Sequence, residues 1–392
     1  GGTTAADAAN KGGVFSTGDN DDWTNPDNWS TGTGAYTGNN RCIPNIQSDV
    51  VVDAASFGGG STIIDLDEDG FVKSIDMSTN DDAVTFDDAA TASNLTVAGD
   101  ATLDADVDFG NFDNAIIFTG ADAGTTHILD VNTADLSTVD ILVNCATTTD
   151  EIQLVEDASF NEIQVQSGVL DLNSLIATCN KLDANIGTAV RGIDFGTNAK
   201  VVVDGSGTVV DFQGANFSLL NTTGTAELEF TDAGQVVVEL GANALVIPDL
   251  DFKASTDIDL FTEKATAAGV PGTVMTFGDV NVGQSGTFDI DADGLRGLNK
   301  TFGGAFTLPN NSVFNINCAD GSAFDATSSE FSGALAIGTG GSGDFAGDFL
   351  EFKGAASFGD NAECEFSDEV QFEGAVTFGT TTGNDVIFKN DS

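Results

Sequence analysis

Short apolar runs alternate with turn residues along nearly the whole chain. Typical runs are Leu95-Thr-Val97, Ile141-Leu-Val143 and Val386-Ile-Phe388, and Gly, Asn or Asp residues separate them. The runs have the length and residue types of β-strands, and no stretch carries the sustained apolar spacing of an amphipathic helix. The pattern predicts an all-β protein with many short strands.

One sequence pattern occurs four times between residues 302 and 378. The copies begin at Phe302, Phe331, Phe352 and Phe372, and each reads Phe-x-Gly-Ala before further alternating residues. The last three copies follow one another at a nearly constant interval, whereas the interval from Phe302 to Phe331 is longer, as if it contained a longer loop. A period of about 20 residues is typical of one turn of a parallel β-helix and is too short for a propeller blade.

We therefore predict a parallel β-helix over residues 49–392 with coils of about 20 residues, which would make roughly 17 turns. The usual crossover rule predicts a right-handed helix. Residues 1–48 differ in texture, because both tryptophans (Trp23 and Trp29) and the single tyrosine (Tyr36) lie there. A string of β-sandwich domains is the alternative, but it would need linkers and usually a buried Trp or Tyr in each unit.

Phenylalanine outnumbers tyrosine 29 to 1. A side chain inside a solenoid has no partner for a hydroxyl group, so Phe is favoured over Tyr in columns of stacked residues. The repeat predicts such columns, since Phe352 returns at Phe372 and Phe358 returns at Phe378.

The chain is strongly acidic: 62 Asp plus Glu against 12 Lys plus Arg give a formal net charge of −50. Repulsion from phosphate makes nucleic acid and anionic membranes unsuitable partners. A hydrophobic content of 41% argues against disorder. No apolar segment is long enough for membrane insertion, and the opening lacks the regions of a signal peptide, so we expect a mature chain if the protein is secreted.

Aspartate supplies 48 of the 62 acids. Asp favours turns and is a hard oxygen ligand, so this bias predicts many turns and bound divalent cations. Some aspartates alternate with apolar residues and would share one face of a strand, about 7 Å apart. Their repulsion could be relieved by Ca²⁺ or by a salty solvent, and both interpretations stay open. These rows are Asp104, Asp106 and Asp108; Asp257 and Asp259; and Asp289, Asp291 and Asp293.

One segment has the spacing of an EF-hand-type calcium loop. Acids stand at positions 1, 3, 5 and 12, and Gly70 stands at position 6, although position 12 is not the usual Glu and the flanks resemble strands. A related segment from Asp289 has basic residues at positions 8 and 12. The predicted Ca²⁺ ligands are Asp65, Asp67, Asp69 and Asp76, with Asp289, Asp291 and Asp293 as a second set.

Four of the five cysteines stand at expected inward positions: Cys145, Cys179, Cys318 and Cys364. A buried free cysteine behaves as a small apolar residue, so we predict free thiols, with bridges between stacked coils as the alternative. Cys42 lies outside the repeat, and either pairing or a free thiol is compatible with its position.

No catalytic motif is present. The single histidine, His127, precludes a multi-histidine metal site, and no nucleophile motif lies near it. Asp-Asp pairs occur, but the Asn-Thr-Asp, Gly-His-Gly and Arg-Ile-Lys motifs of polygalacturonase-like β-helices are absent. We therefore predict that the protein is not an enzyme and that His127 is an ordinary strand residue.

A resemblance is carried by Trp23-Thr-Asn-Pro-Asp-Asn-Trp29-Ser30, followed by Cys42-Ile-Pro44 and Ser48-Asp-Val-Val-Val52. This opening resembles the Trp-x-Asn-Pro-x-Asn-Trp segment of bacterial cell-surface β-helix proteins, notably large adhesins. The resemblance covers about 30 residues. It implies a segment that caps and starts the helix, although an insertion over residues 31–40 departs from the family pattern.

The expected function is that of an extracellular structural protein, a subunit of a cell-surface filament or adhesive fibre that assembles head-to-tail from copies of itself. An open solenoid end exposes strand edges that can accept another strand. The predicted assembly residues are Trp23, Trp29, Tyr36 and Phe388. The alternatives are a monomeric adhesin that binds surface glycans, a viral fibre and a calcium-dependent polysaccharide lyase.

Overall fold

The computed structural model describes residues 10–12, 23–24, 29–31, 43–53, 63–66, 68–79, 83–87, 93–112, 114–120, 124–241, 245–262, 275–292, 300–318, 328–380 and 385–389. Regular structure in these ranges is β-strand alone, and the strands stack as a parallel β-solenoid, which confirms the predicted fold. No helix long and apolar enough to cross a membrane occurs among them. The chain forms two compact units, unit 1 (Gly1–Cys179 and Ala189–Ile193) and unit 2 (Asn180–Thr188 and Asp194–Ser392).

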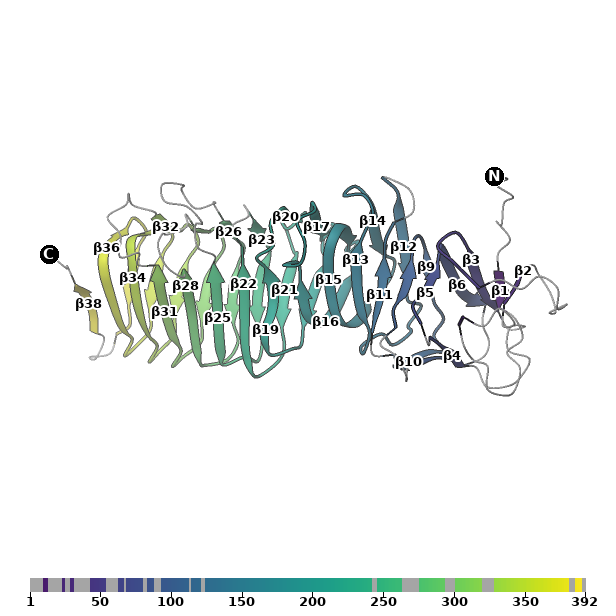
Figure 1. The fold of residues 1–392 in the computed structure, drawn as a ribbon. Helices are drawn as coiled ribbons and strands as arrows, with labels where there is room; N and C mark the ends of the chain where they lie inside the picture. Colours follow the sequence, from purple (N-terminus) through teal and green to yellow (C-terminus); the bar gives the residue numbers. More distant parts are fainter. Residues whose placement is uncertain are drawn as a thin grey trace. The chain divides into compact units, whose positions relative to one another are not determined.

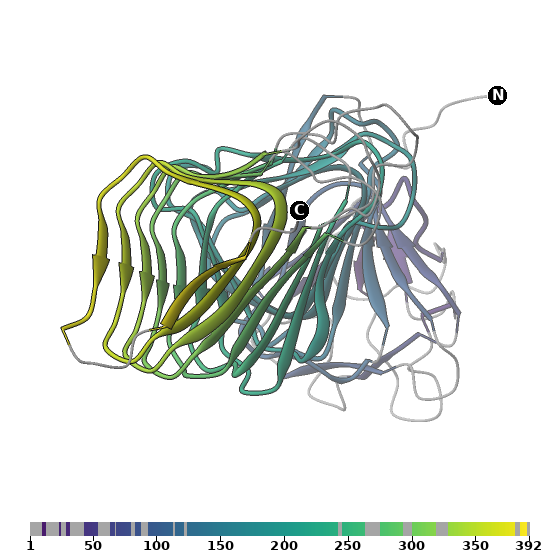
Figure 2. The same cartoon turned by 90° about the vertical axis from the view of Figure 1, so that its left-hand side faces the viewer.

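Each coil of unit 2 passes through three parallel sheets, which we call sheets I, II and III (Figure 2). Sheet I contains β18 (Lys200–Val203), β21 (Glu227–Phe230), β24 (Asp249–Phe252), β27 (Val280–Val282), β30 (Phe306–Leu308), β33 (Leu335–Ile337), β35 (Ala356–Phe358) and β37 (Val376–Phe378).

The strands of sheet II are longer and lie side by side in Figure 1. They are β19 (Gly207–Phe212), β22 (Gln235–Leu240), β25 (Asp257–Thr262), β28 (Thr287–Ala292), β31 (Val313–Cys318), the first parts of β34 (Ser342–Phe352) and β36 (Glu363–Phe372), and β38 (Asp385–Lys389).

Sheet III contains β23 (Val246–Ile247), β26 (Met275–Phe277), β29 (Lys300–Phe302), β32 (Ser328–Phe331) and the second parts of β34 and β36. Strand β20 (Phe217–Leu220) lies between β19 and β21 in the chain.

Unit 1 is also built from parallel strands in three sheets. The first contains β3 (Asp49–Asp53), β6 (Ser74–Thr79), β9 (Ala101–Thr102), β12 (Thr126–Asp130) and β14 (Glu151–Leu154); the second contains β4 (Ile63–Asp65), β7 (Val84–Asp87) and β10 (Val107–Asn111). The third contains β5 (Gly70–Val72), β8 (Leu95–Val97), β11 (Ala115–Phe118) and β13 (Asp140–Asn144). Strand β15 (Ala158–Asp171) is long enough to pair with both β13 and β14; β16 (Ile176–Asp183) and β17 (Arg191–Asp194) follow it.

The first coil of unit 1 is covered by the preceding segment. Strand β1 (Asn10–Gly12) pairs in parallel with β3, and β2 (Trp29–Thr31) pairs antiparallel with β1. The Trp23 side chain is 1% exposed, and its backbone N–H donates to the carbonyl oxygen of Asp65 at 2.7 Å. The next strand of the solenoid, β3, begins at Asp49, and residues 1–48 belong to the same compact unit as the coils that follow.

Most coils of unit 2 are longer than the predicted length of about 20 residues. The registers place Phe331 opposite Phe302 and Phe352 opposite Phe331, so the first of these two coils is the longer one, and the coil that places Thr287 opposite Asp257 is longer still. The additional residues fall between sheets II and III, where β25 ends at Thr262 and β26 begins at Met275. The predicted coil length therefore holds for the last repeats, and the estimate of roughly 17 turns was too high.

Columns of phenylalanine fill the interior of unit 2. Rings of the repeat stack face to face, with centroids 4.6 Å apart for Phe302 and Phe331, 4.8 Å for Phe331 and Phe352, and 4.9 Å for Phe352 and Phe372. Phe358 and Phe378 stack at 5.5 Å. Offset stacking at these distances adds to the free energy gained by burying the rings, and it confirms the predicted return of Phe at the repeat interval.

The Gly-Ala of the repeat makes the turn between sheets III and I. A Cβ atom on Gly333 would lie 1.8 Å from the carbonyl oxygen of Gly304, and one on Gly354 would lie 1.9 Å from that of Gly333. Glycine is therefore required because the backbones of successive turns touch. This contact explains why Gly follows the stacked Phe in each copy.

Short aspartate side chains close many turns. Among the described residues, Oδ1 of at least ten aspartates accepts the backbone N–H two residues later, as at Asp130, Asp183 and Asp232. Others accept an N–H of the next coil: Asp249 from Asp279 at 2.8 Å, and Asp279 from Ala305 at 2.6 Å. Glutamate is one methylene too long for the local bond, which accounts for the excess of Asp.

We expect Gly354→Ala to lower the free energy of unfolding by about 1–3 kcal/mol, because the new Cβ would overlap the Gly333 carbonyl oxygen. Urea unfolding of purified protein measures the change. Gly303→Ala is the matched control, since its Cβ would lie 3.3 Å from the nearest atom, and we expect at most about 1 kcal/mol. Equal effects of the two substitutions would contradict the close turn contact.

We expect Phe352→Tyr to lower the free energy of unfolding by about 1–3 kcal/mol, since Phe352 is 1% exposed and its neighbouring rings offer no hydrogen-bond partner. Phe71→Tyr, at a side chain 43% exposed, is expected to change it by less than about 0.5 kcal/mol. Chemical denaturation of each variant and of the parent measures the free energy of unfolding. An unchanged free energy in Phe352→Tyr would contradict the explanation that buried positions exclude the tyrosine hydroxyl.

Candidate functional site

The outer face of sheet II carries columns of polar residues. Asp259, Asp289, Asn315, Asp344 and Glu365 follow one another in register across β25, β28, β31, β34 and β36. Neighbouring strands lie about 4.8 Å apart, so each carboxylate is close to the next side chain of the column. The expectation that stacked coils bring carboxylates together is confirmed for Asp259 and Asp289.

Side-chain amides compensate part of this charge. Gln235 Nε2 donates to Asp259 Oδ2 at 2.7 Å, and Asn315 Nδ2 donates to Asp289 Oδ1 at 2.8 Å. Asp257 lies on β25 and Asp291 on β28, whereas Asp293 lies outside the described residues. Amide donors lower the repulsion within a carboxylate column without requiring a metal ion.

The aspartates at 104, 106 and 108 do not share one strand, so that prediction was wrong. Ala105 and Asp106 form an exposed turn, and β10 begins at Val107. Asp104 Oδ1 accepts the N–H of Asp106 at 3.1 Å, and Asp108 Oδ1 accepts that of Gly110 at 2.8 Å. The physical reason is that a short carboxylate can close a turn locally, which an alternating pattern does not reveal.

Residues of the predicted calcium loop lie on different elements. Asp65 ends β4, Asp69 precedes β5 and Asp76 lies on β6, whereas Asp67 is outside the described residues. Asp69 Oδ1 accepts the N–H of Asn94 at 2.9 Å, and Asp76 Oδ1 accepts the N–H and hydroxyl of Ser78. The chain bends at Lys73 between β5 and β6, and these two strands belong to different sheets of the solenoid, so the segment is not a single loop between two helices. Calcium binding at these residues stays a prediction.

The carboxylates that converge most closely in the described part of the chain are Glu227, Glu229 and Asp251, whose nearest oxygens all lie within 4.8 Å of one another. They stand on β21 and β24 in register. Lys200 Nζ lies 3.1 Å from Glu227 and 2.8 Å from Glu229, and Lys253 Nζ contacts Glu229 and Asp251. Two ammonium groups thus neutralise part of the negative charge that these three carboxylates bring together.

Sequence reasoning missed this cluster. Glu227-Leu-Glu229 and Asp249-Leu-Asp251 have the same alternation as the other acidic rows, but the step along the chain from Lys200 to Glu227 is longer than the step from Glu227 to Asp249. Unequal coil lengths hide the register from a search for a fixed period.

Ion pairing and burial act against each other in the cluster. Burial is the main cause that raises the pKa of Glu227, and the nearby Lys200 opposes it. The hydrogen bond to Glu229 is the main cause that raises the pKa of Lys200, and the one to Asp251 does the same for Lys253. The lysines therefore stay protonated at neutral pH and hold the three carboxylates together.

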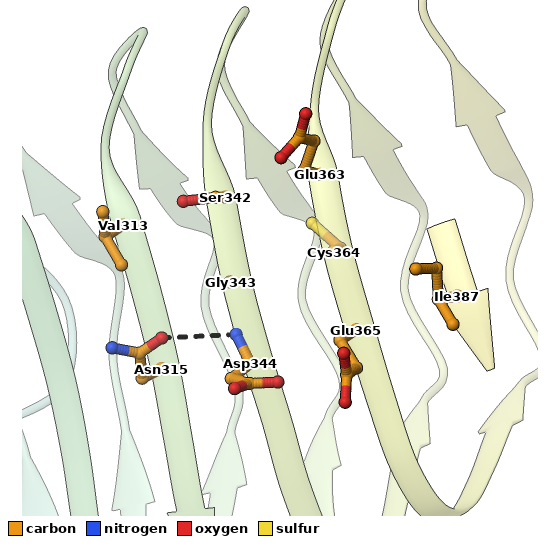
Figure 3. Close-up of a pocket in the computed structure, with 9 residues that line it drawn as sticks. All are labelled: Val313, Asn315, Ser342, Gly343, Asp344, Glu363, Cys364, Glu365 and Ile387. Atoms are coloured by element: carbon orange, nitrogen blue, oxygen red, sulfur yellow. Dashed lines mark hydrogen bonds between the residues drawn. The ribbon is translucent and has the colours of Figure 1, made fainter. Parts of the chain in front are cut away.

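A groove of about 360 Å³ opens on the outer face of sheet II over β31, β34, β36 and β38 (Figure 3). Ser342 and Gly343 are small, and Val313 and Glu363 stand on the flanking strands in register with Ser342, so the surface is hollowed at β34. Further lining comes from Asn315, Asp344, Cys364, Glu365 and Ile387.

Carboxylates dominate the chemistry of this groove. Asp344, Glu363 and Glu365 line it, and neither lysine nor arginine is among the described lining residues. Cys364 is not a candidate nucleophile, because burial raises the pKa of its thiol to about 12. Asn315 Oδ1 accepts the N–H of Asp344 at 3.3 Å. The groove offers mainly hydrogen-bond acceptors, and a ligand would have to supply the donors.

Cys145, Cys179 and Cys364 are buried and form no disulfide bond, as predicted. Cys318 lies on β31 with its side chain outside the described part, and Cys42 is outside it altogether. Burial, assisted by Asp150, raises the pKa of Cys145 to about 12. His127 is a buried residue of β12 whose Nδ1 lies 3.7 Å from Asp100.

The predicted assembly residues are described unevenly. Trp23 is buried in its own chain, so its side chain covers the first coil and is not exposed for docking. Trp29 lies on β2 and Phe388 on β38, both with side chains outside the description, and Tyr36 lies outside it entirely.

Comparison with known proteins adds no relative. The chain matches no protein-family model, no curated protein and no solved structure.

We expect the stability of unit 2 to fall as pH rises from about 4.5 towards neutrality. Burial is the main cause that raises the pKa values of Asp211, Glu227, Glu239 and Asp249, so the folded state binds more protons than the unfolded state in this window. Urea unfolding at a series of pH values measures the slope.

Glu239→Gln should flatten that slope, since it removes one of the four groups. Glu68→Gln, at an exposed carboxylate of unit 1, is the control and should leave the slope unchanged. A stability that rises with pH across this window would contradict the expectation.

Proposed function

We propose that this chain is an extracellular structural protein, a subunit of a cell-surface filament or adhesive fibre that assembles head-to-tail from its own copies. The fold favours this role because the contacts between successive coils of one subunit and the contacts between two subunits can be of the same kind. Each coil binds the next mainly through strand pairing and side-chain stacking, and both kinds of contact can form between subunits as well.

The observation that carries the proposal is the exposure of core positions on β37. Val376 and Phe378 are 37% and 46% exposed, while their counterparts one coil earlier, Ala356 and Phe358, are 1% and 2% exposed. One face of Phe378 stacks on Phe358. Within the described residues, β37 pairs with β35 alone. An apolar surface beside a strand edge that no other described strand covers favours the addition of another coil.

The other side of the proposed joint is the segment of unit 1 that contains β1 and β2. Strand β1 already adds to the first coil in parallel, and β2 pairs with β1 alone among the described strands. The edge of β2 is therefore the one we assign to contact with the next subunit. Burial of Trp23 supports a covering role for this segment in addition to any docking role.

A monomeric glycan-binding adhesin is the second candidate, and the groove on sheet II favours it. A polar hollow of about 360 Å³ is within the range of small-ligand sites. In this case the chain would remain single in solution and bind its ligand through the outer face of sheet II.

Electron microscopy and light scattering of the purified chain test the proposal. We expect filaments for the parent and short particles for Phe378→Ser, because a hydroxyl in place of the exposed ring removes most of the apolar contact. Ile128→Ser is the control, since Ile128 is exposed to 39% on β12 of unit 1, a strand that pairs with β9 on one side and β14 on the other. Filaments unchanged in Phe378→Ser, or a parent that stays monomeric at high concentration, would reject head-to-tail assembly through β37.

The same preparations should be imaged with calcium and then with a chelator. Fraying on chelation would support bound calcium as a cofactor of the polymer. Filaments indifferent to both conditions would favour the amide and lysine contacts as sufficient compensation for the acidic columns.

A further inference from the structure

A ladder of acid and amide side chains runs across the first coils of unit 2. Asp183, Asp211 and Glu239 stand in register on β16, β19 and β22. Asn185 Nδ2 donates to Asp211 Oδ2 at 2.9 Å, and Gln213 Nε2 donates to Glu239 Oε2 at 2.6 Å. Each amide follows the acid of its own coil by two residues and binds the acid of the next coil, so the three coils are joined by side chains as well as by strand pairing.

The acids of this ladder are withdrawn from water although they lie on the outward side of their strands. Asp183 and Asp211 are 7% and 8% exposed, and they follow Leu182 and Val210, which are buried in the core. Successive coils hold the carboxylates about 4.8 Å apart. Carboxylates at this spacing repel one another more strongly when little solvent screens them.

The positive charge in the ladder is smaller than the negative charge. Lys181 Nζ lies 2.7 Å from Asp183 Oδ2. The charges that act on Asp211 are those of Asp183 and Lys181, and the charges that act on Glu239 are those of Asp211 and Asp183. The amides are neutral, so one ammonium group opposes three carboxylates when all of them are ionised.

This imbalance gives the ladder a definite response to pH. Burial is the main cause that raises the pKa values of Asp211 and Glu239, and the neighbouring acids raise them further. The folded state therefore holds protons on these groups more firmly than the unfolded state does. The resulting stabilisation is present at acidic pH and is lost as the pH rises through the raised values of the folded state.

We propose that the ladder of Asp183, Asp211 and Glu239 is a proton-responsive lock for the coils that contain β16, β19 and β22. With Asp211 and Glu239 protonated, the amide contacts and the strand pairing hold this level of the stack closed. With all three acids ionised, repulsion along the column favours local opening of these strands. The device goes beyond the filament role and does not depend on it.

Hydrogen exchange of the full chain, followed by mass spectrometry from pH 4.5 to 7.5 and expressed as protection factors, tests the lock. We expect the amides of β19 and β22 to lose about tenfold more protection over this range than those of β31, since one pKa unit corresponds to a tenfold change. Strand β31 is the internal reference, because its half-buried residues Val313 and Asn315 carry no charge.

Two variants change the charge of the ladder in opposite directions. Lys181→Met keeps the aliphatic stem and removes the ammonium group, so protection of β19 should fall by about tenfold at pH 7.5 and by less than about threefold at pH 4.5. Asp211→Asn removes the middle charge and should flatten the pH profile, whatever its effect at a single pH. Lys73→Met is the matched control, because Lys73 Nζ lies 3.6 Å from Asp49 in unit 1, and it should leave β19 and β22 unchanged at both pH values.

Three results would overturn the lock. The first is protection of β19 and β22 that follows pH no more than that of β31. The second is an equal loss at both pH values in Lys181→Met, which a purely structural contact of this side chain would produce. The third is a pH profile of Asp211→Asn as steep as that of the parent, because the response would then come from groups outside this column.

Discussion

Parallel stacking places each residue of a coil beside one residue of the next coil, about 4.8 Å away. Each side chain therefore packs either against a side chain of the same type or against one that complements its size or charge. Inside unit 2, Phe stacks on Phe at 4.6–4.9 Å along one column, and at the turn Gly contacts Gly. Outside, the same rule places acid beside acid, which is unfavourable unless a donor is supplied.

The molecule meets this unfavourable charge in three ways. Backbone N–H groups at the turns bind many aspartates, amide side chains bind others, and lysines bridge the remaining close groups where the coil supplies them. Hydrogen bonds to a carboxylate favour its charged form, so much of the acidic excess contributes to the structure of the turns. The composition suggested calcium because Asp is a metal ligand, but Asp is equally suited to accept a backbone N–H group.

The fold could be predicted because its signals are local and repeated. Phe-x-Gly-Ala marks one turn with its stacked ring, and the structure explains both residues of the motif through contact between successive coils. The clusters of charge could not be predicted in the same way. Lys200 lies beside Glu227 because the coil between them has one particular length. The next coil in that column, from Glu227 to Asp249, is shorter, so a fixed period does not predict the contact. The groove forms because the small residues Ser342 and Gly343 lie between larger residues of neighbouring coils. These residues are far apart in the sequence, so no single segment predicts the groove.

The contact of glycine with glycine at the turn has a consequence for how such a chain can change in length. A coil that accepts its neighbour without a Cβ clash also accepts a copy of itself, because in the last repeats Gly304, Gly333 and Gly354 stand in one column. Duplication or loss of one whole repeat keeps every column in place, whereas an insertion within a strand shifts all later side chains to the opposite face. Genes for proteins of this build should therefore gain and lose length in steps of a complete coil, with irregular insertions confined to the connection between sheets II and III.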